Sequence, residues 1–210
     1  MGLILDIHLH TSRHSRCSRI RPEDLVGQAV RVGLDGLVIT EHHYQWGLQE
    51  LAELAAASRH PGFILLSAFE YSSSQGDLLV YGLEPQLAGE FRPGWPPERA
   101  AELVQHHGGV CVAAHPTRAD LGFDERLATL PLVAMEVRSV KMKEHEQRLA
   151  LNISEAMRIP AVAGSDAHDL YDVGRYATEF EDLITCSSDL QKALSRGRFH
   201  VVSSTTRDDS

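Results

Sequence analysis

The chain has 210 residues, of which 43% are hydrophobic and 23% are charged, and its formal net charge at pH 7 is −9. This composition is that of a globular domain with one buried core and argues against a disordered chain. The acidic balance disfavours a long nucleic-acid groove, which needs basic side chains to neutralise phosphates.

The cysteines do not follow the pattern of a disulfide framework, because Cys17, Cys111 and Cys186 are odd in number and far apart. The sequence shows no signal-peptide pattern and no apolar run of membrane-spanning length. These features predict a cytoplasmic protein without membrane contact.

Short apolar runs alternate with helical patterns along the chain, which is typical of βαβ units around a parallel sheet or barrel. We expect strands at residues 3–5, 35–40, 63–69, 77–82, 110–114, 132–137 and 159–163. We expect helices at 22–32, 48–58, 98–107, 143–157 and 188–195, with a loop at 84–97, an irregular to helical segment at 119–130 and a short additional strand at 178–180. The pattern predicts an α/β fold, a distorted seven-stranded (β/α)₇ barrel in a single domain over residues 1–202, followed by a disordered tail at 203–210.

Potential metal ligands stand where the predicted strands end. His8 and His10 follow the first apolar run and are two positions apart, so on an extended backbone both imidazoles point to one face. The same placement, at or just past the end of an apolar run, holds for His42, Glu70, His115, Asp166 and His168. Barrels of this kind carry their chemistry at the C-terminal ends of the strands. The set therefore predicts a multinuclear metal site.

Imidazole and carboxylate ligands without thiolate clusters suit Mn²⁺, Zn²⁺ or Fe²⁺ in an open catalytic site. A carboxylate such as Glu70 has two oxygens and can bridge two cations. Paired cations stabilise the attacking and leaving oxygens of a displacement at phosphorus, and they lower the pKa of a bound water toward about 7. The residues are thus suited to phosphoester hydrolysis.

Six short motifs, in order, resemble the PHP (polymerase and histidinol phosphatase) family. They are Asp-Ile-His-Leu-His-Thr, Ile-Thr-Glu-His, Phe-Glu-Tyr, Ala-His-Pro, Met-Glu-Val and Gly-Ser-Asp-Ala-His, and the resemblance runs from about Leu3 to Phe180. It implies a distorted seven-stranded barrel, two or three divalent metal ions and phosphoester hydrolysis. It also implies three ligand groups: His8, His10, Glu70 and Asp166 for one metal; Glu70 as a bridge to a second that His115 also holds; His42 and His168 for a third.

Two positions depart from the family pattern. Where many members have a histidine before the fourth strand, this chain has Asp77, whose oxygens favour Mn²⁺ or Mg²⁺ if it binds a metal. The family's additional third-site ligand comes from the loop after His10, where either His14 or Cys17 takes its place.

Arginines just past the strand ends are candidates for binding an anionic substrate, because their guanidinium groups match phosphate oxygens. We expect Arg16, Arg118 and Arg138 in this role, with Lys141 as a weaker candidate. Glu136 is expected to accept a hydrogen bond from a liganding histidine rather than to bind metal itself.

The predicted function is a metal-dependent phosphoesterase that hydrolyses a small phosphate monoester, such as a nucleotide, amino-alcohol or sugar phosphate, with a metal-bridging hydroxide. Glu70, Asp166 and His168 are the predicted catalytic residues, with either His168 or His42 as the proton donor to the leaving alkoxide. The alternatives are an amidohydrolase-like C–N hydrolase, a phosphodiesterase or exonuclease, and a non-catalytic metal-binding accessory domain. The C–N hydrolase is disfavoured because that family usually bridges its metals with a modified lysine, and no lysine occurs before Glu136.

Overall fold

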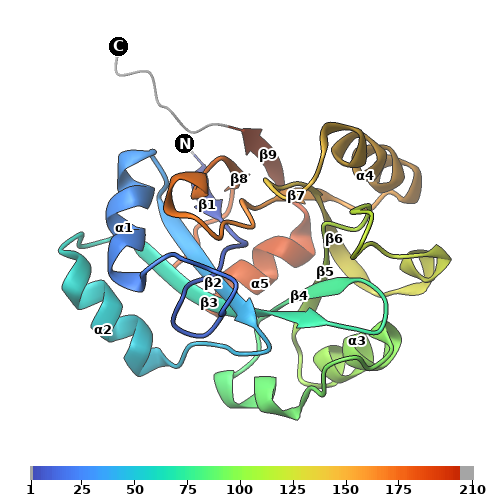
Figure 1. Cartoon of the computed structure of the whole chain (residues 1–210), viewed down its shortest axis with the longest axis horizontal. Helices are drawn as coiled ribbons and strands as arrows, with labels where there is room; N and C mark the ends of the chain where they lie inside the picture. The colour runs from blue at the N-terminus through green and yellow to red at the C-terminus, as the bar shows by residue number, and fades with distance from the viewer. Residues whose placement is uncertain (1, 204–210) are drawn as a thin grey trace.

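The strands of the protein form one continuous sheet that curls into a nearly closed barrel, as the computed structural model of residues 2–203 shows (Figure 1). Within these residues the sheet has nine strands in the order β7-β6-β5-β4-β3-β2-β1-β8-β9. Their bounds are β1 Leu3–Asp6, β2 Gly36–His42, β3 Ile64–Ser72, β4 Asp77–Tyr81, β5 Val110–Ala114, β6 Leu132–Arg138, β7 Ala161–Ala163, β8 Tyr176–Phe180 and β9 Phe199–Ser203.

The α/β class and the single barrel-like sheet agree with the sequence, but the predicted count of seven strands is wrong. Strands β1, β2 and β3 run parallel to one another, as do β5, β6 and β7, whereas β4 is antiparallel to both of its neighbours. The extra strands β8 and β9 extend the sheet beyond β1 in antiparallel fashion. Ser203, expected in a disordered tail, ends β9, and residues 204–210 lie outside the described part of the chain.

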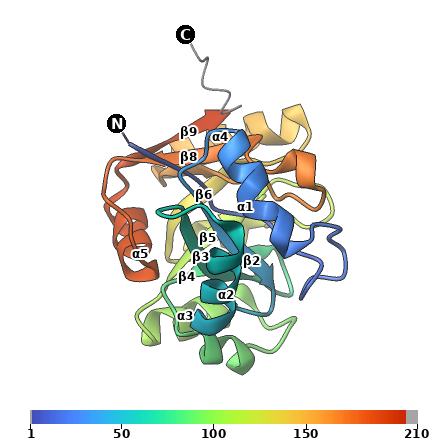
Figure 2. The same ribbon diagram turned by 90° about the vertical axis from the view of Figure 1, so that its left-hand side faces the viewer.

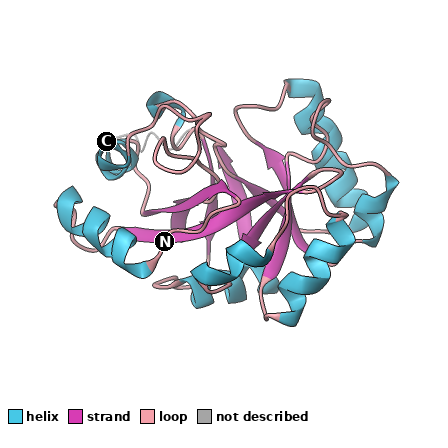
Figure 3. Cartoon of the chain, turned by 60° about the horizontal axis from the view of Figure 1, so that its bottom comes forward, coloured by secondary structure: helices cyan, strands magenta, loops and turns pink. Residues whose placement is uncertain are grey.

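Helices surround the barrel, as Figure 3 shows. They are α1 Pro22–Arg31, α2 Leu48–Ser58, α3 Pro97–His106, α4 Glu144–Met157 and α5 Ser187–Arg196, with short 3-10 turns η1 Pro85–Glu90, η2 Glu125–Thr129 and η3 Leu170–Asp172. α1 begins as the sequence indicates, with proline in the first turn followed by Glu23 and Asp24, which favour the positive end of the helix dipole. No helix among residues 2–203 has both the length and the apolar character needed to cross a bilayer.

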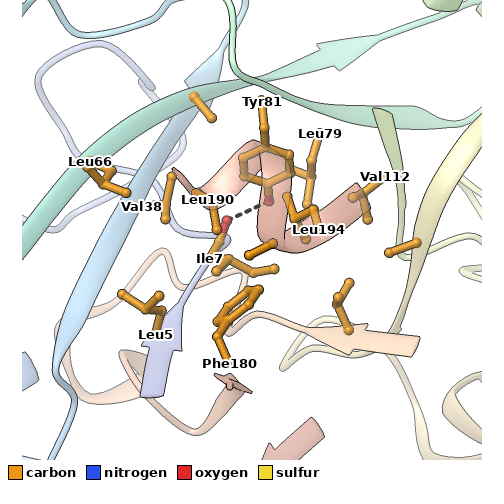
Figure 4. Packing of buried hydrophobic residues seen from close by; sticks show 14 of the residues in the cluster. Leu5, Ile7, Val38, Leu66, Leu79, Tyr81, Val112, Phe180, Leu190 and Leu194 are labelled. Atoms are coloured by element: carbon orange, nitrogen blue, oxygen red, sulfur yellow. Dashed lines mark hydrogen bonds between the residues drawn. The ribbon is translucent and has the colours of Figure 1, made fainter. Parts of the chain in front are cut away.

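Helix α5 closes one end of the barrel and leaves the other end for the polar site. In Figure 2, α5 lies at one end and the blue loop that follows β1 lies at the opposite end. Leu190 and Leu194 of α5 pack in one buried cluster with Leu5, Val112 and other strand residues (Figure 4). Burying these side chains contributes roughly 1.5–3 kcal/mol each. The apolar packing of α5 against the strands therefore closes and stabilises this end of the barrel.

Strands β7 and β8 are joined through a side chain rather than a strand ladder. The Thr178 hydroxyl donates to the Ala163 carbonyl at 2.8 Å and accepts from the Ala163 amide at 3.0 Å, in a fully buried position. Nearby, the buried Asp6 carboxylate accepts from the backbone amides of Ser165 at 2.8 Å and Gly174 at 3.0 Å. These bonds hold the segment that follows β7 against β1, where the predicted ligands of both strands meet.

Thr178→Val tests this closure. The substitution keeps the side-chain shape but leaves the Ala163 amide and carbonyl without their hydroxyl partner, so we expect a loss of about 1–3 kcal/mol in the free energy of unfolding. Urea denaturation measures the loss. Thr129→Val, at an exposed position whose hydroxyl bonds the Arg126 carbonyl, is the matched control, and equal losses in the two variants would contradict the assigned role.

Candidate metal centre

The predicted ligands come together at the end of the barrel opposite α5. They are contributed by β1, β2, β3, β5 and β7 or the residues just after them: His8 and His10, His42, Glu70, His115, and Asp166 with His168. Asp77, the first residue of the antiparallel β4, joins them because β4 runs down the barrel from this same end. A pocket of about 450 Å³ opens above them, lined by Cys17, Arg19, His42, Glu70, Asp77, His115, Arg118, Leu121, Lys141, Asp166, His168 and Asp169.

Glu70 is the centre of the cluster. Its Oε2 lies 3.0 Å from His42 Nδ1 and 3.2 Å from His10 Nε2, and its Oε1 lies 3.0 Å from His115 Nε2. The side chain is buried, and Oε2 makes no hydrogen bond of regular geometry despite these neighbours. Glu70 therefore offers an oxygen lone pair to a site that ring nitrogens approach from several strands.

Other buried polar atoms at this site also lack hydrogen-bond partners within the described residues. They include Asp166 Oδ2 and His115 Nδ1, while His8 Nε2 and His10 Nε2 face each other at 3.2 Å. Buried polar atoms in proteins are nearly always paired with protein, water or an ion, so this group of unpaired ones marks a place where a bound ion would be stabilised. Imidazole nitrogens and carboxylate oxygens with free lone pairs fit divalent cations.

Potential ligand atoms lie within 4.8 Å of one another in four overlapping groups, and Glu70 belongs to two of them. The groups are His8–His10–Glu70, His8–His115–Asp166, Glu70–Asp77–His115 and His10–His42–His168. Glu70 would therefore be shared by two of these groups if cations were bound, and Asp77 belongs to one of the same groups.

Glu136 supports two candidate ligands from behind. Its carboxylate lies 2.9 Å from His8 Nδ1 and accepts from the His115 backbone amide at 2.8 Å. Because Nδ1 is engaged in this way, His8 directs Nε2 into the site. Gly164, directly after β7, allows this segment to approach His8 closely, because a Cβ at Gly164 would stand 2.5 Å from His8 Cβ.

Two of the candidate ligands have unusual backbones. His115 has a φ of 28° and Asp166 has a φ of 51°, in a region that residues other than glycine seldom occupy. Such conformations cost on the order of 1–3 kcal/mol and persist where surrounding contacts enforce them. Here the His115 amide is held by Glu136, and the Asp166 amide donates to the His8 carbonyl at 2.7 Å. The strain aims both side chains into the pocket.

The electrostatics suit cation binding. Burial opposes ionisation of Asp166, but the neighbouring His8 and His10 outweigh it and lower the pKa of its carboxyl to about 2. Burial and the proximity of Glu70 raise the pKa of Asp77 to about 6. Burial, together with His10, lowers the pKa of His168 to about 4, so its imidazole is neutral at pH 7. A neutral imidazole suits a metal ligand and disfavours the alternative role of His168 as proton donor.

The loop after β1 carries both candidates for an additional metal ligand, His14 and Cys17, but places them differently. His14 stacks on Tyr44 with ring centroids 3.8 Å apart, and its Nε2 lies 3.1 Å from Glu50 Oε1, outside the pocket. Cys17 lines the pocket, although it belongs to none of the groups of potential ligand atoms that lie within 4.8 Å of one another. Of these two, the structure brings Cys17 alone to the site.

The predicted arginines are only partly brought to the pocket. Arg118 lines it, with Nη1 3.9 Å from Asp166 Oδ2. Arg16 and Arg138 are not among its lining residues within the described chain; Arg16 is exposed in the loop, and the register of β6 against β7 shifts between Glu136 and Arg138. Lys141, the weaker candidate, does line the pocket. Arg19 lines it as well, although it was not among the arginines predicted from the sequence.

The comparisons with known proteins agree with this geometry. Residues 144–199 match the family model described as PHP-associated. The chain is similar to a two-domain protein from Bacteroides vulgatus that contains a predicted PHP-like metal-dependent phosphoesterase, with 16% identity and a TM-score of 0.77. That match covers 97% of this chain and 65% of the other, so the chain spans slightly less than two thirds of that protein. No curated protein sequence matches the chain.

Two further solved structures share the fold. A lesion-specific endonuclease from Pyrococcus furiosus aligns with a TM-score of 0.68 at 15% identity, over 96% of this chain and 58% of that protein. An amidohydrolase from Chromobacterium violaceum aligns with a TM-score of 0.63 at 18% identity, over 98% of this chain and 99% of the other. The predicted resemblance to the PHP family is thus confirmed, in the match of the C-terminal segment and in the fold of the whole chain.

Glu136→Gln tests the support behind the ligands. The amide cannot supply the carboxylate charge to His8 and the His115 amide together, so we expect metal affinity to fall about 10- to 100-fold. Calorimetric titration of metal-free protein with Mn²⁺ measures this. Glu98→Gln, at the start of α3, is the control with the same chemistry. Unchanged affinity in Glu136→Gln would show that the buried acid does not position the ligands.

Proposed function

We propose that this protein is a metal-dependent phosphoesterase that releases phosphate from a small monoester. One observation supports it above all: imidazoles that follow β1, β2 and β5 lie within 3.2 Å of the buried Glu70 carboxylate, whose Oε2 has no hydrogen-bond partner among the described residues. When bound, divalent cations would supply Lewis-acid polarisation of the phosphate and an activated water. The residues proposed to hold them are His8, His10, His42, Glu70, Asp77, His115, Asp166 and His168, and Cys17 lines the same pocket.

The remaining residues of the pocket have roles that follow from their positions. The Arg118 guanidinium lies 3.9 Å from Asp166 Oδ2 and makes no closer polar contact with a described residue, so it is available to the phosphate oxygens and to the charge that develops on them. Arg19 and Lys141 add positive charge at the pocket wall, although Arg19 also pairs with Asp169 at 3.4 Å. Glu136 and Gly164 keep His8 in position.

Among the alternatives, the nucleic-acid substrate has the lesion-specific endonuclease as a structural relative. Against it stand the net charge of −9 and a pocket of about 450 Å³, which suits a small molecule. A C–N hydrolase has the amidohydrolase as a relative. The bridging position in this chain belongs to Glu70, and no lysine precedes Glu136. We therefore favour the phosphate monoester.

His115→Ala and Asp166→Asn test the proposal. Each removes one proposed ligand, so we expect less bound metal per chain by plasma mass spectrometry. We also expect phosphate release from a monoester panel to fall at least about 100-fold, the upper end of the loss seen for residues that only support a ligand. His60→Ala, an exposed histidine in the turn after α2, is the control. Full activity in either ligand variant, or no activity of metal-loaded wild-type protein on any phosphate ester, would refute the proposal.

A second experiment addresses the substrate anion. Arg118→Gln removes a guanidinium beside Asp166, and we expect kcat/KM for a monoester to fall about 10- to 100-fold, as for the loss of a charged hydrogen bond. Arg138→Gln, which the sequence suggests equally but the structure places outside the pocket, should change it less than about twofold. An equal loss in both variants would contradict the assignment of Arg118.

A further inference from the structure

A second, apolar cavity adjoins the candidate metal centre. It has a volume of about 500 Å³ and lies between the segment that follows β5 and one face of α4. Its apolar lining is Phe123, Leu127, Leu149, Ile153 and Met157. We call this cavity the α4 groove. Arg118 lines both the α4 groove and the metal pocket, so the two cavities share a wall.

The shared wall is a rigid turn. The Arg118 amide donates to the His115 carbonyl at 3.0 Å, and the Gly122 amide returns to the Arg118 carbonyl at 2.7 Å. Helix α4 holds this turn from outside, because the Thr117 hydroxyl donates to the Glu146 carbonyl at 2.7 Å and the Ala119 amide to the Glu146 carboxylate at 3.0 Å. The turn that carries the candidate ligand His115 thus ends where the groove begins.

The groove runs away from the site along α4. Leu149, Ile153 and Met157 are spaced four residues apart, so they form one stripe on the helix, about 12 Å long at 1.5 Å per residue. Leu149 is 50% exposed, which leaves this apolar face open to a ligand. Two acidic residues lie at the groove: Asp124 is paired with Arg126 at 3.2 Å, and Glu125 is exposed. An uncharged, apolar group fits this lining.

We infer that the α4 groove binds the organic part of the substrate, and that this part is an unbranched or aromatic apolar group attached to the phosphate. The inference rests on the proposed phosphoesterase function. The guanidinium of Arg118 lies 3.9 Å from the Asp166 carboxylate at the metal pocket, and Arg118 lines the α4 groove as well. A monoester held in this way places its polar end at the metal centre and its apolar end against Leu149 and Ile153.

A series of primary alkyl phosphates, from ethyl to hexyl, tests the inference. Their leaving alcohols have nearly the same acidity, so differences in kcat/KM report on binding of the chain. Each buried methylene adds at most about fourfold, and we expect the metal-loaded protein to prefer hexyl over ethyl phosphate by at least about tenfold.

Helix α4 offers a matched pair of variants. Leu149 lines the groove, and Leu151, 36% exposed, does not. We expect Leu149→Asn to lower kcat/KM for hexyl phosphate about fivefold and to leave ethyl phosphate unchanged, since only the longer chain reaches the groove. Leu151→Asn should change neither. Turnover without any dependence on chain length, or equal effects of both variants, would overturn the inference and leave the phosphoesterase proposal intact.

If no ester is hydrolysed, the phosphoesterase proposal fails and the groove is tested by binding alone. Calorimetric titration with hexylphosphonate, which cannot be hydrolysed, should then show weaker binding to Leu149→Asn than to Leu151→Asn; equal binding would overturn the inference. Analytical ultracentrifugation of the same proteins tests whether a second copy of the chain, rather than a substrate, occupies the groove. A dimer that Leu149→Asn dissociates would show that a second copy fills the groove, and would also overturn it.

Discussion

The constraint on which the site depends is the burial of several carboxylates beside several imidazoles. Glu70, Asp77, Glu136 and Asp166 are all buried at one end of one barrel. Like charges in a medium of low polarity repel strongly, and each also loses its hydration. Such a group of acids is stable only with compensating cations, which are protons on the histidines or metal ions between them. The histidines respond accordingly: burial disfavours their charged form, yet the nearby acids raise the pKa of His8 well above its usual value and that of His10 to about 9.

This constraint explains features of the fold that no single strand requires. The barrel is closed at the α5 end by apolar packing and is polar at the other end. All candidate metal ligands therefore lie at that second end. The segment after β7 must approach β1 closely, which Gly164 permits and the Asp6 carboxylate secures. The positive φ angles of His115 and Asp166 serve the same arrangement, because each lets the chain turn soon after a strand with the side chain directed into the pocket.

Much of this arrangement could be predicted, because strand ends are visible as the ends of apolar runs. A barrel with its chemistry at those ends follows from the pattern, and so does the grouping of His42, Glu70 and His115. Strand β9 could not be predicted: its run of Phe199 to Val202 is short, and its pairing with β8 is a tertiary contact. The position of Arg138 at the end of a strand predicted a role in the pocket, but the β6–β7 ladder shifts its register between Glu136 and Arg138. The path of the loop that carries His14 and Cys17 likewise depends on contacts with Tyr44 and Glu50 that no local pattern encodes.

The metal pocket and the α4 groove meet at Arg118 but are otherwise lined by different residues, which affects how substrate specificity can change. His115 and Arg118 lie on one turn that is held by Glu136 on one side and Glu146 on the other. A change within that turn would disturb the candidate ligand and the candidate phosphate contact together. Leu149 and Ile153 lie on α4 and line the α4 groove but not the metal pocket. If the groove binds the organic part of the substrate as proposed, side chains on this face could change the group that is accepted without altering the candidate metal ligands, and the choice of substrate would be separate from the chemistry performed on it.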